Sequence, residues 1–136
     1  MSFLLDTNVV SELRKRAPNP HVLAWHKAHV QDEAFLSVLV IGELRQGVER
    51  LRPKDLGHAD ALDQWISGLL RAYADRILPV SVHVADLWGR LNVSARPPAV
   101  DGLLAATALA HGLTLVTRNV AHVARTGVQV VNPFGP

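Results

Sequence analysis

The chain has 136 residues, of which 49% are hydrophobic, enough for one domain with a continuous core. It has no cysteine, which excludes disulfides, thiolate zinc sites and a thiol nucleophile. Its 14 Lys and Arg residues against 12 Asp and Glu residues give a net charge of +2, too small by itself to indicate a nucleic-acid partner.

Short apolar runs alternate with amphipathic stretches along the chain. In the first half of the chain the pattern predicts a strand at 3–5, a short helix to about residue 14, a helix at 22–30, a strand at 34–37, and helices at 38–51 and 61–73. In the second half it predicts a strand at 77–80, a helix capped by Ser81, a helix from Asp101 to Gly112, and strands at 113–116 and 129–131. Pro79 favours an edge position for the third strand. With no β-hairpin signal, this alternation predicts the α/β class, with a parallel sheet wrapped by helices.

No apolar run approaches the roughly 18 residues that a membrane span needs. Asp6 interrupts the first apolar run after five residues, so a secretory signal is not expected either. We therefore expect a cytoplasmic protein that makes no membrane contact.

Polar residues follow several of the predicted strands. Asp6 ends the first strand, Thr117 and Asn119 follow the fourth, Glu43 lies in the first turns of the helix after the second, and Asp101 opens an alanine-rich helix. The carboxyl ends of parallel strands open into one crevice, so these side chains are expected to gather there. Clustered carboxylates repel unless a cation holds them, and oxygen ligands suit Mg²⁺ or Mn²⁺. Such a cation can activate water against a phosphodiester.

Each of these residues also has a structural interpretation. Asp6 and Asp101 can cap the helices that follow them, Glu43 can be a solvated glutamate, and Asn119 is a common turn residue. Only their joint placement at one end of a parallel sheet favours a site.

Four blocks of sequence resemble PIN-domain ribonucleases of the VapC type, the toxin halves of bacterial toxin–antitoxin pairs. They are Leu4-Leu5-Asp6-Thr7-Asn8-Val9-Val10-Ser11-Glu12-Leu13, Leu36-Ser37 with Ile41-Gly42-Glu43-Leu44-Arg45-Gln46-Gly47, Asp101-Gly102-Leu103-Leu104-Ala105-Ala106-Thr107-Ala108, and Leu113-Thr114-Leu115-Val116-Thr117-Arg118-Asn119. The closing Val131-Asn132-Pro133-Phe134 is similar to the FitB-like subgroup. The blocks span the chain in order.

The resemblance implies a three-layer α/β/α sandwich, a single PIN domain over residues 1–136, and Mg²⁺- or Mn²⁺-dependent endoribonuclease activity. It assigns Asp6 and Asp101 as the principal metal ligands, with Glu43 completing the site directly or through water and Asn119 at the fourth position. The supporting residues that it implies are Thr7, Asn8 and Thr117. We also expect Arg14, Lys15, Arg16 and Arg118 to hold the RNA backbone, with a plain basic surface as the alternative.

The chain departs from the family pattern at three positions. Asn119 stands where aspartate is common, and a carboxamide is a weaker ligand. His122 occupies the place of another family aspartate, and we expect it to be an exposed surface histidine, with a substrate-contacting role as the alternative. Gly102 replaces a better helix former, at a cost of roughly 1 kcal/mol inside a helix.

The resemblance also implies partners: an RNA substrate and a cognate VapB-type antitoxin whose C-terminal segment covers the acidic cleft. We expect a homodimer through helices 38–51 and 61–73, which carry Trp65 and Tyr73, and a larger assembly with the antitoxin. One alternative is a non-catalytic PIN-like module that binds RNA or a partner. Another is a phosphohydrolase or receiver-type domain with Asp6 as phosphoryl acceptor, but Asp6-Thr7-Asn8 lacks the second aspartate of a haloacid-dehalogenase-like site.

Overall fold

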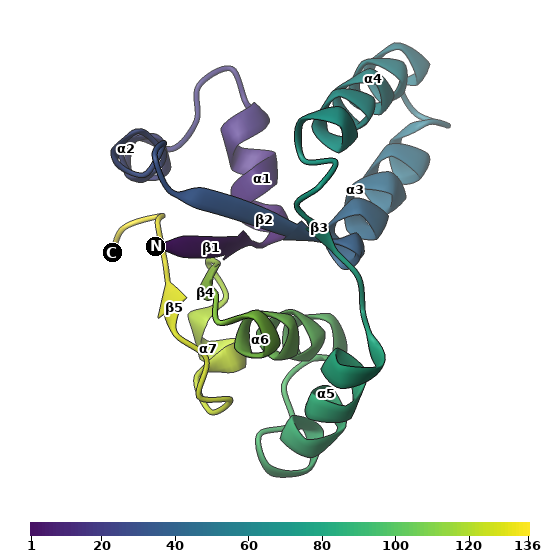
Figure 1. Cartoon of the computed structure of the whole chain (residues 1–136). Helices are drawn as coiled ribbons and strands as arrows, with labels where there is room; N and C mark the ends of the chain where they lie inside the picture. Colours follow the sequence, from purple (N-terminus) through teal and green to yellow (C-terminus); the bar gives the residue numbers. More distant parts are fainter.

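Five parallel strands form the centre of the molecule in a computed structural model that describes the whole chain, Met1–Pro136 (Figure 1). The strands are β1 (Ser2–Leu5), β2 (Glu33–Ser37), β3 (Ile77–Leu78), β4 (Thr114–Val116) and β5 (Val130–Val131). Their order is β3-β2-β1-β4-β5, and every neighbouring pair is parallel. The reversal of strand order beside β1 places the end of β1, and hence Asp6, at the point where open α/β sheets form a crevice.

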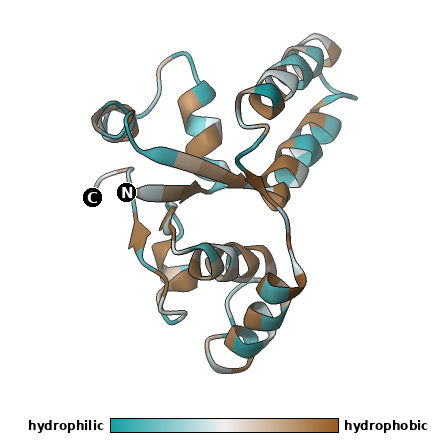
Figure 2. Cartoon of the chain, in the orientation of Figure 1, coloured by the Kyte–Doolittle hydropathy of each residue, from teal (hydrophilic) through white to brown (hydrophobic).

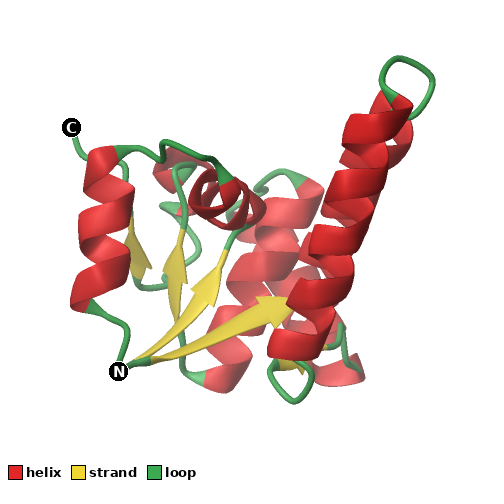
Figure 3. Cartoon of the chain, turned by 90° about the horizontal axis from the view of Figure 1, so that it is seen from above, coloured by secondary structure: helices red, strands yellow, loops and turns green.

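Helices cover both faces of this sheet (Figure 1). One layer holds α1 (Thr7–Arg14), α2 (Pro20–Ala28), α3 (Val38–Leu51) and α4 (Leu56–Ala72), and the other holds α5 (Val82–Ser94), α6 (Ala99–His111) and α7 (Val120–Val123). The helices α3 and α4 form a hairpin that reaches beyond the sheet (Figure 3). The predicted α/β/α sandwich with a parallel sheet is confirmed. None of the helices combines the length and the apolar character that crossing a membrane requires.

The core lies where the central strands meet the helices. Leu4, Leu36 and Leu115 come from β1, β2 and β4 and are at most 1% exposed. Apolar residues concentrate on the strands and alternate with hydrophilic ones along the helices (Figure 2). Strands buried on both faces read as continuous apolar runs, which is why short runs such as Phe3-Leu4-Leu5 could be recognised as strands.

Several helix boundaries differ from the prediction. Helix α2 begins at Pro20, because Asn19 accepts hydrogen bonds from the next free N–H groups. Helix α4 begins at Leu56, five residues early, because Asp55 caps it. Helix α6 begins at Ala99, so Asp101 lies inside its first turn and is not its cap. The short α7 was not predicted. The edge position of β3 and the left-handed Gly112 at the end of α6 are confirmed.

Gly102 is explained by close packing. A Cβ atom at this position would lie 2.7 Å from Pro97 Cγ and 3.2 Å from the Trp88 ring. The sequence-based estimate treated this glycine as a loss of helix propensity only. The structure shows that α6 needs it in order to approach Trp88 and Pro97.

Candidate active site

Asp6 is the most buried acidic side chain, at 4% exposed, directly after β1. Its backbone N–H donates to the carbonyl of Val116 across to β4, at 2.9 Å. As the N-cap of α1 it accepts a hydrogen bond from the backbone N–H of Thr7 at 2.7 Å. The hydroxyl of Thr117 donates to Asp6 Oδ2, also at 2.7 Å. Asp6 therefore caps a helix and also carries a fixed carboxylate into the crevice.

Burial raises the pKa of the Asp6 carboxyl above its ordinary value. The hydrogen bonds from Thr117 and Thr7 lower the pKa, and the nearby negative charges of Asp101 and Glu43 raise it further. Asp101 and Glu43 are therefore close enough to Asp6 to act on its carboxyl. No lysine or arginine forms an ion pair with any of them.

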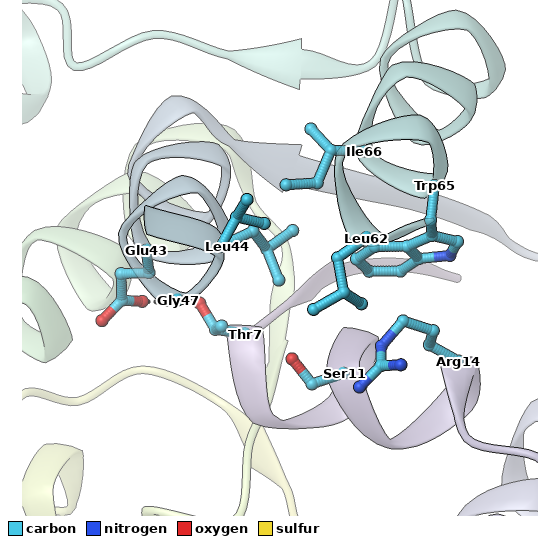
Figure 4. Close-up of a pocket in the computed structure, with 10 residues that line it drawn as sticks. Thr7, Ser11, Arg14, Glu43, Leu44, Gly47, Leu62, Trp65 and Ile66 are labelled. Atoms are coloured by element: carbon cyan, nitrogen blue, oxygen red, sulfur yellow. Dashed lines mark hydrogen bonds between the residues drawn. The ribbon is translucent and has the colours of Figure 1, made fainter. Parts of the chain in front are cut away.

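Glu43 reaches the site from α3. It is half-buried, and the hydroxyl of Thr7 donates to its Oε1 at 2.5 Å, which joins α1 to α3 (Figure 4). The interpretation of Glu43 as a solvated glutamate is therefore wrong. Thr7 contributes a backbone N–H to Asp6 and a hydroxyl to Glu43, so this one residue orients two carboxylates.

Asp101 is the third residue of α6 and makes no capping hydrogen bond. His122, on α7, places its Nδ1 atom 2.7 Å from Asp101 Oδ2. The expectation of an exposed surface histidine is confirmed, since the side chain is 51% exposed, but its contact with an acidic residue was not predicted. Sequence reasoning missed this contact because α7, a single turn, gave no helical signal.

A polar network ties the ends of β1 and β4 together. Asn8 Nδ2 lies 3.4 Å from both Asp6 Oδ2 and Thr117 Oγ1. Asn8 Oδ1 accepts from the backbone N–H of Arg118 at 3.2 Å, and Thr117 Oγ1 accepts from that of Asn119 at 3.0 Å. The side chain of Asn119 itself makes no hydrogen bond. Asn8 and Thr117 thus connect Asp6 to the segment that follows β4.

The donors fit a hard divalent cation. They are carboxylate oxygens without a lysine or arginine partner, and mutual repulsion would be relieved by a positive ion among them. However, no three acidic or histidine side chains converge on one point in the structure. The side chains of Asp6, Glu43 and Asp101 lie near one another but are engaged separately, by Thr117, Thr7 and His122.

The four predicted RNA-contacting residues differ in their surroundings. Lys15 donates to the buried Glu12 at 2.9 Å, and this bond, with that from the Asn19 backbone N–H, lowers the pKa of Glu12. Arg14 lies over the Trp65 ring at 5.7 Å, whereas Arg16 is exposed. The role of Glu12 as a partner of Lys15 was not predicted. Its position as the one acidic residue just before the basic residues 14–16 could have indicated such an ion pair.

A groove made of three cavities that share lining residues lies among α1, α2, α3 and α4. It starts at a cavity of about 190 Å³ that Thr7, Glu43, Arg14 and Trp65 help to line (Figure 4). A second cavity shares Arg14 and Trp65 with the first, and a third shares Leu5, His26 and Tyr73 with the second. We call these three adjoining cavities the apolar groove.

The fold and this site define a class of protein: an α/β/α domain with neighbouring acidic side chains at the carboxyl ends of a parallel sheet. The family model of the PIN domain matches residues 3–127, and the chain belongs to this family.

Relatives cover nearly the whole chain. It is 36% identical to toxin FitB from Neisseria gonorrhoeae, over 96% of this chain and 97% of that protein. It is 34% identical to VapC ribonuclease Y4jK from Sinorhizobium fredii, over 98% of each. The crystal structure of FitAcB from Neisseria gonorrhoeae matches with a TM-score of 0.90 at 34% identity, over 98% of this chain and 99% of that chain. The resemblance to VapC-type and FitB-like proteins is confirmed.

Proposed function

We propose that this chain is a metal-dependent endoribonuclease and the toxin of a VapBC-type toxin–antitoxin module. The observation that carries the proposal is the buried Asp6 carboxylate, fixed by two hydrogen bonds beside Glu43 and Asp101 and without a basic counter-ion. The names of the two relatives, a toxin and a VapC ribonuclease, support it. Mg²⁺, or Mn²⁺ in its place, is the cofactor that the oxygen donors favour.

Asp6, Asp101 and Glu43 would hold the cation, with Asn119 beside them at the fourth position. When bound, such a cation lowers the pKa of water and neutralises negative charge on a phosphodiester. Thr117 and Thr7 keep the carboxylates of Asp6 and Glu43 oriented, so that no reorganisation is needed during the reaction. The arginines near the crevice would hold the RNA backbone.

Cleavage in the presence of different metals tests the proposal. Purified protein is incubated with structured and single-stranded RNAs in Mg²⁺, in Mn²⁺ and in EDTA, next to an Asp101→Asn variant purified in the same way. We expect cutting with either metal, none in EDTA, and a rate at least about 100-fold lower in the variant, because one carboxylate of the site is lost. Equal rates for both proteins would identify a contaminant.

Calorimetric titration of the metals separates the remaining outcomes. Metal binding without cleavage would mean that the panel lacks the right RNA. Neither cleavage nor metal binding would contradict the proposal and favour the alternative, a non-catalytic PIN-like module that binds RNA or a partner.

The apolar groove fits a cognate VapB-type antitoxin. It leads from Tyr73 past Trp65 to Glu43, and so an apolar segment lying in it would reach the acidic crevice. The solved relatives include a toxin–antitoxin complex from Klebsiella pneumoniae, which shares the fold. We propose that the C-terminal segment of the antitoxin occupies this groove and covers the site in the cytoplasm, where the chain would act.

We propose that residues 1–136 form one PIN domain, since β5 and the buried Phe134 lie beyond the matched residues yet complete the sheet and core. This domain is expected to form a homodimer and to join the antitoxin in a larger assembly. Light scattering at micromolar concentration should give twice the chain mass of 14.8 kDa. A monomer that persists on concentration would contradict the dimer.

A further inference from the structure

Arg118 and Phe134 form a pair next to the polar network of Asp6, Asn8 and Thr117. The guanidinium carbon of Arg118 lies 3.9 Å from the centroid of the Phe134 ring. The backbone N–H of Arg118 is bonded to Asn8, whose amide lies next to Asp6 Oδ2. The base of the Arg118 side chain is therefore tied to the site, and its charged end rests on an aromatic ring.

The guanidinium keeps its hydrogen-bonding capacity. Arg118 is exposed and takes part in no ion pair, and its side chain makes no hydrogen bond. By contrast, Lys15 is paired with Glu12. A guanidinium over an aromatic ring uses a face of its plane, while its N–H groups, which lie in that plane, stay free for bidentate contact with a phosphate.

The C-terminal segment fixes the ring. The backbone N–H of Phe134 donates to Asn132 Oδ1 at 3.0 Å, Pro133 is buried, and Phe134 is 7% exposed within the hydrophobic core. Gly135 has a positive φ of 83° and lies so close to His21 that a Cβ would be 2.8 Å from its ring. The closing Asn-Pro-Phe-Gly segment is thus held on both sides of the ring.

We propose that Phe134 is a positioning residue that holds Arg118 as a clamp for a phosphate of the bound RNA. The proposal rests on the proposed ribonuclease function. Because the ring is fixed before RNA arrives, less side-chain freedom is lost when the phosphate is bound. The partner of this pair is the RNA backbone, so the clamp contributes affinity without base preference.

RNA affinity in an uncleaving background tests the clamp. In Asp6→Asn protein, binding of a fluorescein-labelled 20-nucleotide single-stranded RNA of mixed sequence is followed by anisotropy between 50 and 200 mM NaCl. We expect Arg118→Ala to weaken binding about fivefold to tenfold and to reduce the salt slope by about 0.7, the loss of one phosphate contact. Phe134→Leu, which retains an apolar side chain but loses the ring, should weaken binding about threefold, and Phe134→Tyr should not.

The double variant distinguishes positioning from a general structural effect. In Arg118→Ala protein, Phe134→Leu should weaken binding no further, because the two residues act through one contact. Arg71→Ala, at an exposed arginine of α4, serves as the control and should bind as the parent does. Unchanged binding in Phe134→Leu, or an equal loss with and without Arg118, would overturn the clamp alone. If the parent itself bound no RNA, the clamp would be wrong, whereas the ribonuclease proposal is decided separately by the metal-dependent cleavage and metal-binding measurements.

Discussion

Asp6→Asn is expected to abolish RNA cleavage, with a rate at least about 1,000-fold below wild type, since a metal ligand supplies several kcal/mol of transition-state stabilisation. The change is nearly isosteric. Asparagine is as good an N-cap as aspartate, so α1 and its hydrogen bond from Thr7 should be retained. The measurement is the single-turnover rate on an RNA that wild type cuts, in saturating Mg²⁺.

The same variant should be more stable than wild type when metal is removed. Burial raises the pKa of Asp6 above its unfolded value, so the stability that the protonated carboxyl contributes is lost as the pH rises through the raised pKa. At neutral pH the wild type must then bury a charge, which the asparagine lacks. In EDTA the melting temperature of Asp6→Asn should exceed that of wild type at pH 7, and the difference should shrink towards pH 4.

Two comparisons control these expectations. Asp86→Asn removes an exposed carboxylate from α5 and should cut RNA at the wild-type rate. Adding Mg²⁺ should raise the melting temperature of wild type but not of Asp6→Asn, because only a cation bound to the folded state stabilises it. Equal stabilisation of both proteins would show that the cation binds elsewhere.

The parallel sheet and the edge position of β3 followed from local sequence, because buried parallel strands are short-range patterns. The placement of Asp6, Glu43 and Asp101 at one end of that sheet followed from the polar residues at the strand ends. The helix starts at Pro20 and Leu56 were missed because caps one residue outside a helix were weighed less than apolar spacing. Boundaries of this kind depend on a single hydrogen bond.

Contacts between distant segments could not be predicted in this way. A solvated Glu43 stayed open as the alternative because nothing near it in sequence indicates that Thr7, 36 residues away, would donate to it. The contact between His122 and Asp101 depends on a one-turn helix packing beside α6. Such pairs depend on how the helices pack against one another, and the hydrophobic periodicity of the sequence predicts individual helices but not their packing.

Gly102→Ala is expected to destabilise the protein by up to about 2 kcal/mol, although alanine is the better helix former. Overpacking costs about 1–3 kcal/mol, against a propensity gain of about 1 kcal/mol. The new methyl group would meet Pro97 Cγ at 2.7 Å and Trp88 at 3.2 Å. The Trp88 indole N–H has no hydrogen-bond partner to hold the ring, so the stiff ring of Pro97 decides the cost. Because Asp101 is the preceding residue, RNA cleavage should fall as well.

Gly89→Ala provides the matched control. Gly89 also lies inside a helix, α5, but an added Cβ there would have no neighbour within 4 Å. Its substitution should stabilise the protein by about 0.5–1 kcal/mol, through helix propensity alone. Urea unfolding of both variants and wild type gives the two differences. If both substitutions raised the free energy of unfolding, helix propensity would dominate at Gly102 as well. The close packing of α6 against Trp88 and Pro97 would then not explain why a glycine precedes the rest of the helix beside Asp101.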